Sequence, residues 1–194
     1  MNSKSQNSLD LESVIVTAEL NHRPFRTPDF QAENAIIVSL VEEMAKSPED
    51  IFQKLVEAVL ELCDAQSAGI SLLDKGNKKF FWPAIAGKWK PYIGGGTPRD
   101  FGPCGTVLDR NATLLFSHPE RHFNYLAEAS PAIEEGLLAL FYINGKAVGT
   151  IWAIAHDAEH QFDVEDARAL ESLSKFTSAA YKTLADIGAI NQLH

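Results

Sequence analysis

The stretch "LLALFYINGKAVGTIWAIAH", residues 137–156, decides the fold of this chain. Two apolar runs, rich in β-branched and aromatic residues, flank the dipeptide Asn144-Gly145. An Asn-Gly pair favours a two-residue hairpin turn, because both central residues of that turn need a positive φ. The stretch therefore predicts two antiparallel strands, at 137–143 and 146–156, joined by a tight turn.

A long amphipathic helix is predicted directly after this hairpin. Asp163 can cap its first turn, and Asp166 stands at the position from which a side chain bonds back to the cap. Apolar residues then recur at intervals of three and four, which is the helical period. The predicted helix covers 163–188, and its apolar stripe contains Leu170, Leu173, Phe176, Ala180, Tyr181, Leu184 and Ile187.

The first half of the chain predicts two helices and a second hairpin. The helices cover 33–63 and meet at Ser47-Pro48, which fits an N-cap followed by a first-turn proline. The period then shortens to two over 68–74 and 79–87, which is typical of paired strands. Pro83 has no N–H to donate, so its strand has to run at a sheet edge or contain a bulge.

Irregular segments and one short helix separate the two hairpins. A glycine-rich loop spans 88–100, a helix is expected over 103–110, and a second loop spans 111–136, with a turn of helix after Ser130. Antiparallel hairpins combined with amphipathic helices predict an α+β domain with the helices packed on one face of the sheet.

Composition excludes several classes of partner. The formal net charge is -9, and no cluster of Lys or Arg offsets it, so neither nucleic acid nor an anionic membrane surface is an expected partner. No apolar run is long enough to span a bilayer, and the first ten residues lack the apolar centre of a secretion signal. The two cysteines, Cys63 and Cys104, predict free thiols in a reducing cytoplasm. We expect one domain over 30–190, after a polar lead and extended arm over 1–29.

Four motifs make the chain similar to the GAF domain, a small sensory fold of signalling proteins. They are "AGISLLD" (68–74), "FGPCGTVLDRN" (101–111), "YINGKAVGTIWAIAH" (142–156) and "FDVEDARALESLSKFTSAA" (162–180). Among GAF domains, the chain most resembles those near the front of bacterial sensor kinases. The resemblance implies an antiparallel sheet of five or six strands, with the N- and C-terminal helices on one face. The ligand pocket would lie on the other face, under the loops.

Cys104 is the residue on which an enzymatic interpretation depends. Some GAF proteins are free methionine-(R)-sulfoxide reductases, whose pattern includes a Gly-x-Cys-Gly segment similar to Gly102–Gly105. Those enzymes contain two further cysteines, which would fall near Gly94 and Leu126, and this chain has neither. Because thiol reduction of a sulfoxide needs a second sulfur to resolve the sulfenic acid, we expect no catalytic residue here.

Three other roles remain for Cys104. Bilin-binding GAF domains attach their pigment to a cysteine that is typically followed by histidine, whereas Gly105 follows here. A cysteine in the first turn of a helix can have a stabilised thiolate, which would suit a redox sensor. A free cysteine also packs as a small apolar residue, and we expect Cys104 to line the pocket in this way.

The expected ligand pocket takes its residues from the loops and strands around Cys104. Backbone N–H groups of 102–106, together with the charge of Arg99, would suit a carboxylate or a phosphate. Aromatic side chains there would stack on a planar ligand. The sequence identifies no cofactor, and the predicted ligand-binding residues are Trp82, Arg99, Phe101, Cys104, Gly105, Thr106, Tyr125, Phe141 and Trp152.

Two pairs of histidines stand four residues apart. His118 and His122 form one pair, and His156 and His160 form the other. Both lie in predicted loops without an evident third ligand, so no metal site is predicted.

Taken together, these features predict a non-catalytic sensory domain of the cytoplasm. A small molecule would bind under the pocket loops, and the terminal helices would relay its occupancy in signal transduction, as in a two-component system. The stripe at Phe176, Ala180, Leu184 and Ile187 would pair two copies into a homodimer that acts on a downstream signalling partner. The alternative is a thiol reductase, or a single-cysteine redox sensor, that uses Cys104.

Overall fold

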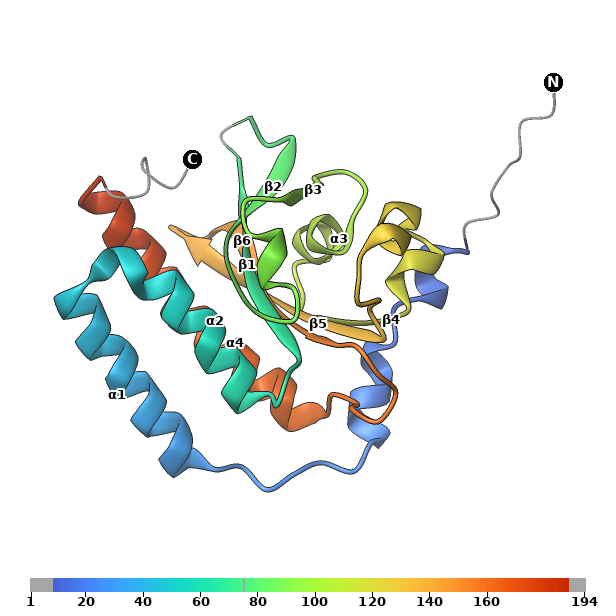
Figure 1. Ribbon diagram of the computed structural model, residues 1–194, viewed down its shortest axis with the longest axis horizontal. Helices are drawn as coiled ribbons and strands as arrows, with labels where there is room; N and C mark the ends of the chain where they lie inside the picture. Colours follow the sequence, from blue (N-terminus) through green and yellow to red (C-terminus); the bar gives the residue numbers. More distant parts are fainter. Residues whose placement is uncertain (1–8, 75, 189–194) are drawn as a thin grey trace.

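The computed structural model describes residues 9–74 and 76–188 of the 194-residue chain (Figure 1). Short 3-10 helices connect the main elements. In chain order these elements are α1 (Phe30–Lys46), α2 (Ile51–Leu62), β1 (Ser67–Leu73), β2 (Lys79–Gly87), β3 (Gly96–Pro98), α3 (Pro103–Arg110), β4 (Leu114–Ser117), β5 (Glu135–Ile143), β6 (Lys146–Ala155) and α4 (Val164–Asp186).

The strands form one antiparallel sheet, which has six strands in the order β3-β2-β1-β6-β5-β4. The predicted α+β class is confirmed. The hairpin of β5 and β6 turns at Asn144-Gly145, whose φ angles are 49° and 76°. Both residues adopt the left-handed conformation that the tight turn requires.

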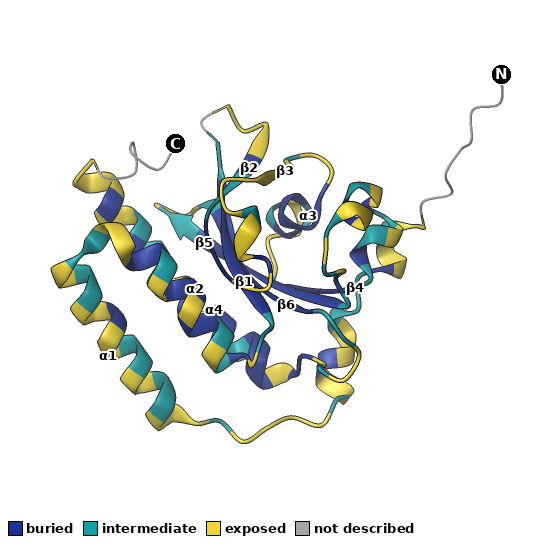
Figure 2. Cartoon of the chain, in the orientation of Figure 1, coloured by how far each residue is buried: buried dark blue, intermediate teal, exposed yellow. Residues whose placement is uncertain are grey.

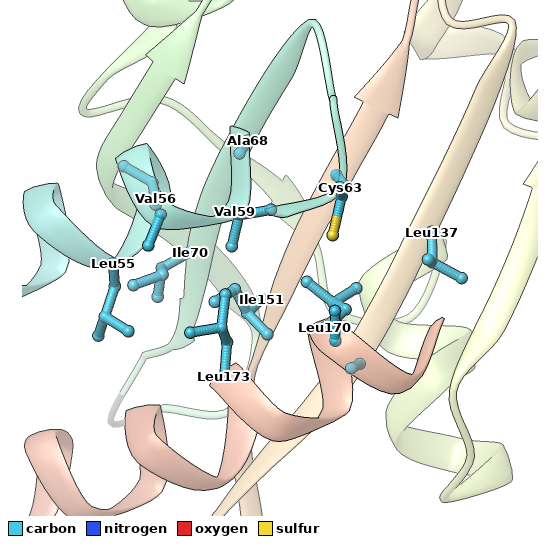
Figure 3. Close-up of a cluster of buried hydrophobic side chains, with 14 of the residues drawn as sticks. Leu55, Val56, Val59, Cys63, Ala68, Ile70, Leu137, Ile151, Leu170 and Leu173 are labelled. Atoms are coloured by element: carbon cyan, nitrogen blue, oxygen red, sulfur yellow. The ribbon is translucent and has the colours of Figure 1, made fainter. Parts of the chain in front are cut away.

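The pleat of the sheet divides the apolar residues between two cores. On β6, Ile151 and Ala153 face α2 and α4, whereas Trp152 and Ile154 lie on the opposite face. We call the first cluster the helix-side core and the second the pocket-side core. Figure 3 shows the helix-side core, where side chains of α2 and α4, Cys63 among them at the end of α2, meet those of β1, β5 and β6.

The long helices α1, α2 and α4 lie on one side of the sheet, as predicted for the N- and C-terminal helices, whereas the short helix α3 lies over the opposite face. Of the long helices, α2 and α4 cover the sheet, and α1 lies outside them, alongside α2 (Figure 1). The predicted capping box at the start of α4 is present. The Asp163 side chain accepts a hydrogen bond from the backbone N–H of Asp166, and the Asp166 side chain accepts one from the backbone N–H of Asp163. Within the described residues, no helix combines the length and apolar character that crossing a membrane requires.

The predicted dimer stripe of α4 packs inside its own chain. Ala180 and Leu184 are 1% and 0% exposed and belong to the helix-side core, and Phe176 packs against that core. Ile187 alone of the four is strongly exposed, at 58%. The prediction that these four side chains pair two copies is therefore wrong, because covering the sheet already uses their apolar surface.

Two short strands lie in stretches that the sequence predicted to be loops. β3 pairs with β2, and a Cβ at Gly96 would fall 1.9 Å from the carbonyl oxygen of Phe80, so the close approach needs glycine. β4 pairs with β5. With three and four residues, both strands are too short for an alternating pattern to stand out. The bulge expected at Pro83 is present, since the register between β1 and β2 shifts there.

Residues 9–29 follow the edge of the sheet. Ile15 forms a β-bridge with Phe116 of β4, and Val16 donates a backbone hydrogen bond of 2.8 Å to the carbonyl of Leu115. Val14 and Leu20 are buried, in the pocket-side and the helix-side core respectively. The segment predicted as an extended arm thus contains 3-10 helices and contributes to both cores, while residues 1–8 of the predicted polar lead lie outside the described part. We refer to residues 9–29 as the arm.

Two arginines of the arm bind carboxylates near the start of α4. Arg23 pairs with the buried Glu135 at 2.6 Å and donates to the carbonyl of Phe162 at 2.7 Å. Arg26 pairs with Asp166 at 2.7 Å, and its backbone N–H donates to the side chain of Asp163. These contacts hold the arm against the turn from which α4 begins.

Burial makes Asp166 sensitive to pH. Its side chain is 6% exposed, and the loss of hydration raises the pKa of Asp166 to about 6 despite its ion pair with Arg26. A folded-state pKa above the unfolded one means that the folded protein holds the proton more tightly, so this group stabilises the fold at low pH. That contribution is lost as pH rises from about 4 through about 6.

We expect the wild-type protein to lose stability relative to Asp166→Asn as pH rises from about 4 to about 6, by on the order of 2 kcal/mol. Denaturant unfolding at a series of pH values measures this difference. Asp186→Asn, at an exposed aspartate of the same helix, is the control for removing a carboxylate from α4. A difference between wild type and Asp166→Asn that does not vary with pH would contradict the assignment.

Candidate functional site

A small cavity lies on the face of the sheet opposite α2 and α4. Its volume is about 40 Å³. The sheet forms its floor, and α3 together with the segment 118–133 covers it (Figure 1). We refer to 118–133 as the cap segment and to this space as the cavity. The side chains that line it are Trp82, Trp89, Thr97, Pro103, Cys104, Phe116, Pro119, Leu126, Ile133, Leu138, Trp152 and Ile154.

The three tryptophans of the chain meet at this cavity. The ring centroids of Trp82, Trp89 and Trp152 lie 6.0 to 6.2 Å apart in all three pairings. Gly69 of β1 makes room for one of them, because a Cβ there would fall 2.1 Å from Cζ2 of Trp152. Because Gly69 has no side chain, the Trp152 indole can pack against the sheet and form part of the cavity wall.

Ser71 joins three elements beneath the cavity. Its hydroxyl oxygen accepts a hydrogen bond from the Trp152 indole N–H at 3.0 Å and another from the Cys104 thiol at 3.3 Å. Ser71 lies on β1, Trp152 on β6 and Cys104 on α3. One fully buried hydroxyl thus fixes both an indole of the wall and the first turn of α3.

The Cys104 thiol is a weak acid in this environment. It is buried, at 5% exposure, and burial raises the pKa of the Cys104 thiol, although nearby Ser71, Thr150 and Thr97 oppose the shift. The alternative of a stabilised thiolate at the helix start is therefore disfavoured, because desolvation outweighs the local dipoles, and Cys104 is a buried side chain that lines the cavity, as expected. Cys63 is in the helix-side core and Cys104 in the pocket-side core, so the sheet separates the two sulfurs.

Four buried polar atoms around the cavity make no hydrogen bond within the described residues. They are Nε1 of Trp82, Oγ1 of Thr97, Oγ1 of Thr150 and the hydroxyl of Tyr125. Trp82 and Thr97 line the cavity, Thr150 lies near the Cys104 thiol, and the Tyr125 hydroxyl lies near both Cys104 and Thr97, in each case without a hydrogen bond of good geometry. A buried polar atom without a partner costs about 1–3 kcal/mol, so four around one small space make the cavity the candidate site.

The structure brings some of the predicted site residues together. Trp82, Cys104 and Trp152 line the cavity, and Tyr125 packs in the core beside it. Phe101 lies at the rim, 40% exposed, against the rings of His122 and Phe123.

Two predicted pocket residues lie elsewhere. Phe141 is in the helix-side core, where its ring packs on Tyr181, because its place in β5 points it away from the cavity. Arg99 lies against the outside of α3, where it pairs with Asp109 at 2.5 Å and donates to the carbonyl of Gly105. The predicted anion clamp is therefore corrected, since the guanidinium is already neutralised by a carboxylate of α3.

Gly105 and Thr106 serve the geometry of α3. A Cβ at Gly105 would fall 2.0 Å from the carbonyl oxygen of Arg99, so the helix packs on that backbone. Thr106 donates both its N–H and its hydroxyl to the carbonyl of Gly102. Neither residue lines the cavity.

Sequence reasoning missed Thr97, Trp89 and the cap segment. Thr97 belongs to the short strand β3, which appeared as a glycine-rich loop. Trp89 lies at the start of the same predicted loop, and Leu126 and Ile133 belong to a stretch without a readable period. The turn of helix predicted after Ser130 is wrong, because 3-10 helices precede that point.

Polar contacts attach the cap segment to the wall of the cavity. The Tyr92 hydroxyl accepts from the backbone N–H of Ser130 and donates to its carbonyl, and the Trp89 indole donates to the carbonyl of Pro131 at 2.9 Å. His156 bonds to the carbonyl of Ala132 through Nδ1. Across residues 9–74 and 76–188, no three His, Cys, Asp or Glu side chains are grouped to hold a metal ion.

The unpaired hydroxyl of Thr97 leads to a test of stability. We expect Thr97→Val, which keeps the shape and removes the hydroxyl, to raise the free energy of unfolding by about 1 kcal/mol. Thr177→Val is the matched control, because that hydroxyl is equally buried but donates to the carbonyl of Leu173 at 2.8 Å. The control should lower the free energy of unfolding by up to about 1 kcal/mol. A loss of stability in Thr97→Val would show that its hydroxyl has a partner.

Comparisons with known proteins agree with this architecture. Residues 45–180 match the family model of the GAF domain. The GAF domain of an Acinetobacter phosphoenolpyruvate-protein phosphotransferase superposes with a TM-score of 0.68 at 18% identity, over 83% of this chain and 98% of that one. Free methionine-R-sulfoxide reductase from Neisseria meningitidis, solved with its substrate, superposes with a TM-score of 0.67 at 17% identity, over 84% of this chain and 97% of that one.

A third structure is the GAF-B domain of DevS from Mycobacterium smegmatis, with a TM-score of 0.60 at 12% identity, over 74% of this chain and 99% of that one. No curated protein sequence matches the chain. At these identities the solved structures show a shared fold, whereas the family model covers more than half of the sequence. The chain belongs to the GAF domain family, whose fold serves sensing and regulation in signalling proteins.

Proposed function

We propose that this protein is a non-catalytic sensory domain that binds a small molecule in the cavity and transmits its presence through the arm to α1 and α4. The observation that carries the proposal is the group of four unpartnered polar atoms around a cavity walled by three tryptophans. A ligand that pairs those atoms would recover the free energy lost on burying them. The domain would act in the cytoplasm, where free thiols persist, as part of a signalling system of the two-component type.

The surroundings of the two thiols support a role without catalysis. A thiol that reduces a sulfoxide has to ionise and then meet a second thiol that resolves the sulfenic acid. Burial disfavours ionisation of Cys104, and Cys63 lies across the sheet in the other core. The same burial speaks against a redox sensor, since an oxidant needs access to the thiolate.

The first half of the proposed relay runs from the cavity to the arm. Phe116 lines the cavity and bridges to Ile15 of the arm through the backbone. The cap segment meets the arm as well, because Leu9 donates its N–H to the carbonyl of Arg121 and accepts a bond from the His122 ring. A shift of the cap segment on ligand binding would therefore move the start of the arm.

The second half runs from the arm to the helices. Arg26 binds both capping residues of α4, Asp163 and Asp166, shortly before the chain enters α1. Arg168 of α4 in turn pairs with Glu33 of α1 at 2.5 Å. The starts of α1 and α4 are thus linked to the arm by ion pairs, whose geometry would respond to its position.

The proposed homodimer would use the outer face of α1 in place of the α4 stripe. Val38 and Val41 are 50% and 54% exposed, and the exposed Ala35 and Ala45 extend the same face by one turn each way. Figure 2 shows α1 mostly exposed or half-buried, in contrast to α2 and α4. Covering this apolar face against a second copy would remove it from water and join the relay helices of two domains.

We expect the wild-type protein to be a dimer and Val38→Glu/Val41→Glu to be a monomer, because two buried carboxylates would oppose association. Light scattering coupled to gel filtration measures the mass of each. Val164→Glu, at an exposed valine at the start of α4, should leave the dimer intact. A monomeric wild type, or a dimer that survives the double substitution, would contradict this interface.

The relay is tested by hydrogen exchange. A small-metabolite library is first screened for compounds that raise the melting temperature, which is measured by tryptophan fluorescence. These compounds should also change amide protection over 24–36 and 162–170. In Arg26→Gln the same compounds should still raise the melting temperature and protect the cap segment, but the change at α1 and α4 should be lost. A compound that binds in the cavity and leaves both helix starts unchanged in the wild type would argue against the relay.

A further inference from the structure

Within residues 9–74 and 76–188, no charged side chain lines the cavity. Of the described residues that line it, none has an ionisable acid or base other than the Cys104 thiol. The charged side chain predicted for the site, Arg99, lies outside α3 with Asp109. A ligand with a net charge would therefore lose its hydration without meeting an opposite charge, which is costly in an apolar space.

The polar atoms near the cavity are neutral groups of two kinds. The Trp82 indole N–H can only donate, whereas the hydroxyls of Thr97, Thr150 and Tyr125 can donate or accept. The wall facing the cavity is apolar, and these atoms lie buried behind it. A ligand therefore needs an apolar part that contacts the wall and a polar group. Small rotations of the surrounding side chains would bring their buried polar atoms into hydrogen-bond distance of that group.

The size of the cavity limits the ligand further. A water molecule needs roughly 10–15 Å³ of such space, so the 40 Å³ present hold the equivalent of about three waters. Three indole rings in mutual contact leave little freedom for the wall to widen. A nucleotide or a tetrapyrrole would require the cap segment to unfold from the sheet, whereas a molecule of a few heavy atoms requires only side-chain adjustment.

We infer that the cavity selects a compact, uncharged molecule of a few heavy atoms, with a hydrogen-bond acceptor for the Trp82 indole and a donor or acceptor for the Thr97 hydroxyl. Small carboxamides combine these properties and are the class that we propose. The inference rests on the proposed function, since it names the ligand class of that same cavity. It also excludes the carboxylate or phosphate that the sequence suggested.

Acetamide, acetate and acetamidinium test the inference, because they are nearly the same shape and differ in charge. The chain has three tryptophans, all at the cavity, so the three indole N–H signals of protein labelled with ¹⁵N-tryptophan report on this site alone. We expect millimolar acetamide to shift these signals, that of Trp82 most strongly because its N–H gains a partner. Acetate and acetamidinium should bind at least about tenfold more weakly. Trp82→Phe assigns the signal.

Thr97→Val identifies the polar contact. It should weaken acetamide binding several-fold while the protein stays folded, and Thr177→Val, in the helix-side part of the molecule, should not change it. If Thr97→Val binds acetamide more weakly but unfolds less readily than the wild type, the Thr97 hydroxyl contributes to ligand binding at a cost in stability.

The outcomes separate this inference from the proposed function. Acetamide binding that exceeds that of both ions and depends on Thr97 supports the inference. If acetate or acetamidinium shifts the indole signals as strongly as acetamide, the inference falls while a ligand-binding domain stands. If neither these three compounds nor any member of the metabolite library perturbs the indoles, the proposed function falls with it.

Discussion

The candidate site depends on the hydroxyl of Ser71, which accepts hydrogen bonds from the Trp152 indole and the Cys104 thiol. These two bonds tie β1 to β6 and to the first turn of α3 at one buried point. Because the oxygen accepts both, the indole and the thiol cannot turn away without leaving a buried donor unpaired. The positions of the cavity floor and of the helix above it follow from this one group.

The sheet around Ser71 separates two kinds of packing. On the helix side, apolar side chains of α2 and α4 fill the space, and the buried thiol of Cys63 is simply part of that filling. On the other side the packing leaves a cavity with largely aromatic walls, and polar atoms around it lack hydrogen-bond partners. Apolar groups that closed this space would be expected to add stability, and the proposed function accounts for its presence by a ligand.

The charged side chains named above lie away from the cavity lining. The ionised groups of the pocket side are engaged at its margins, as Arg99 is with Asp109, and the arm brings Arg23 and Arg26 to the start of α4 instead. The result is a neutral cavity linked by the backbone of β4 and the cap segment to a charged joint between arm and helices. Under the proposed function, binding would rest on neutral contacts in the cavity, whereas transmission would rest on ion pairs at this joint.

The sequence by itself determined the elements whose patterns are local. The Asn144-Gly145 turn, the capping box of Asp163 and Asp166, and the helical stripe of α4 each rest on residues close together in the chain, so propensity and periodicity suffice to find them. The resemblance to GAF domains placed the cavity on the correct face. The tertiary structure alone decided what surrounds it: that Phe141 faces the helices, that Arg99 turns to α3, and that Thr97 and Trp89 reach the cavity. Such assignments depend on strand register and on contacts between distant segments, and a shift of register by one residue moves a side chain to the other face of the sheet.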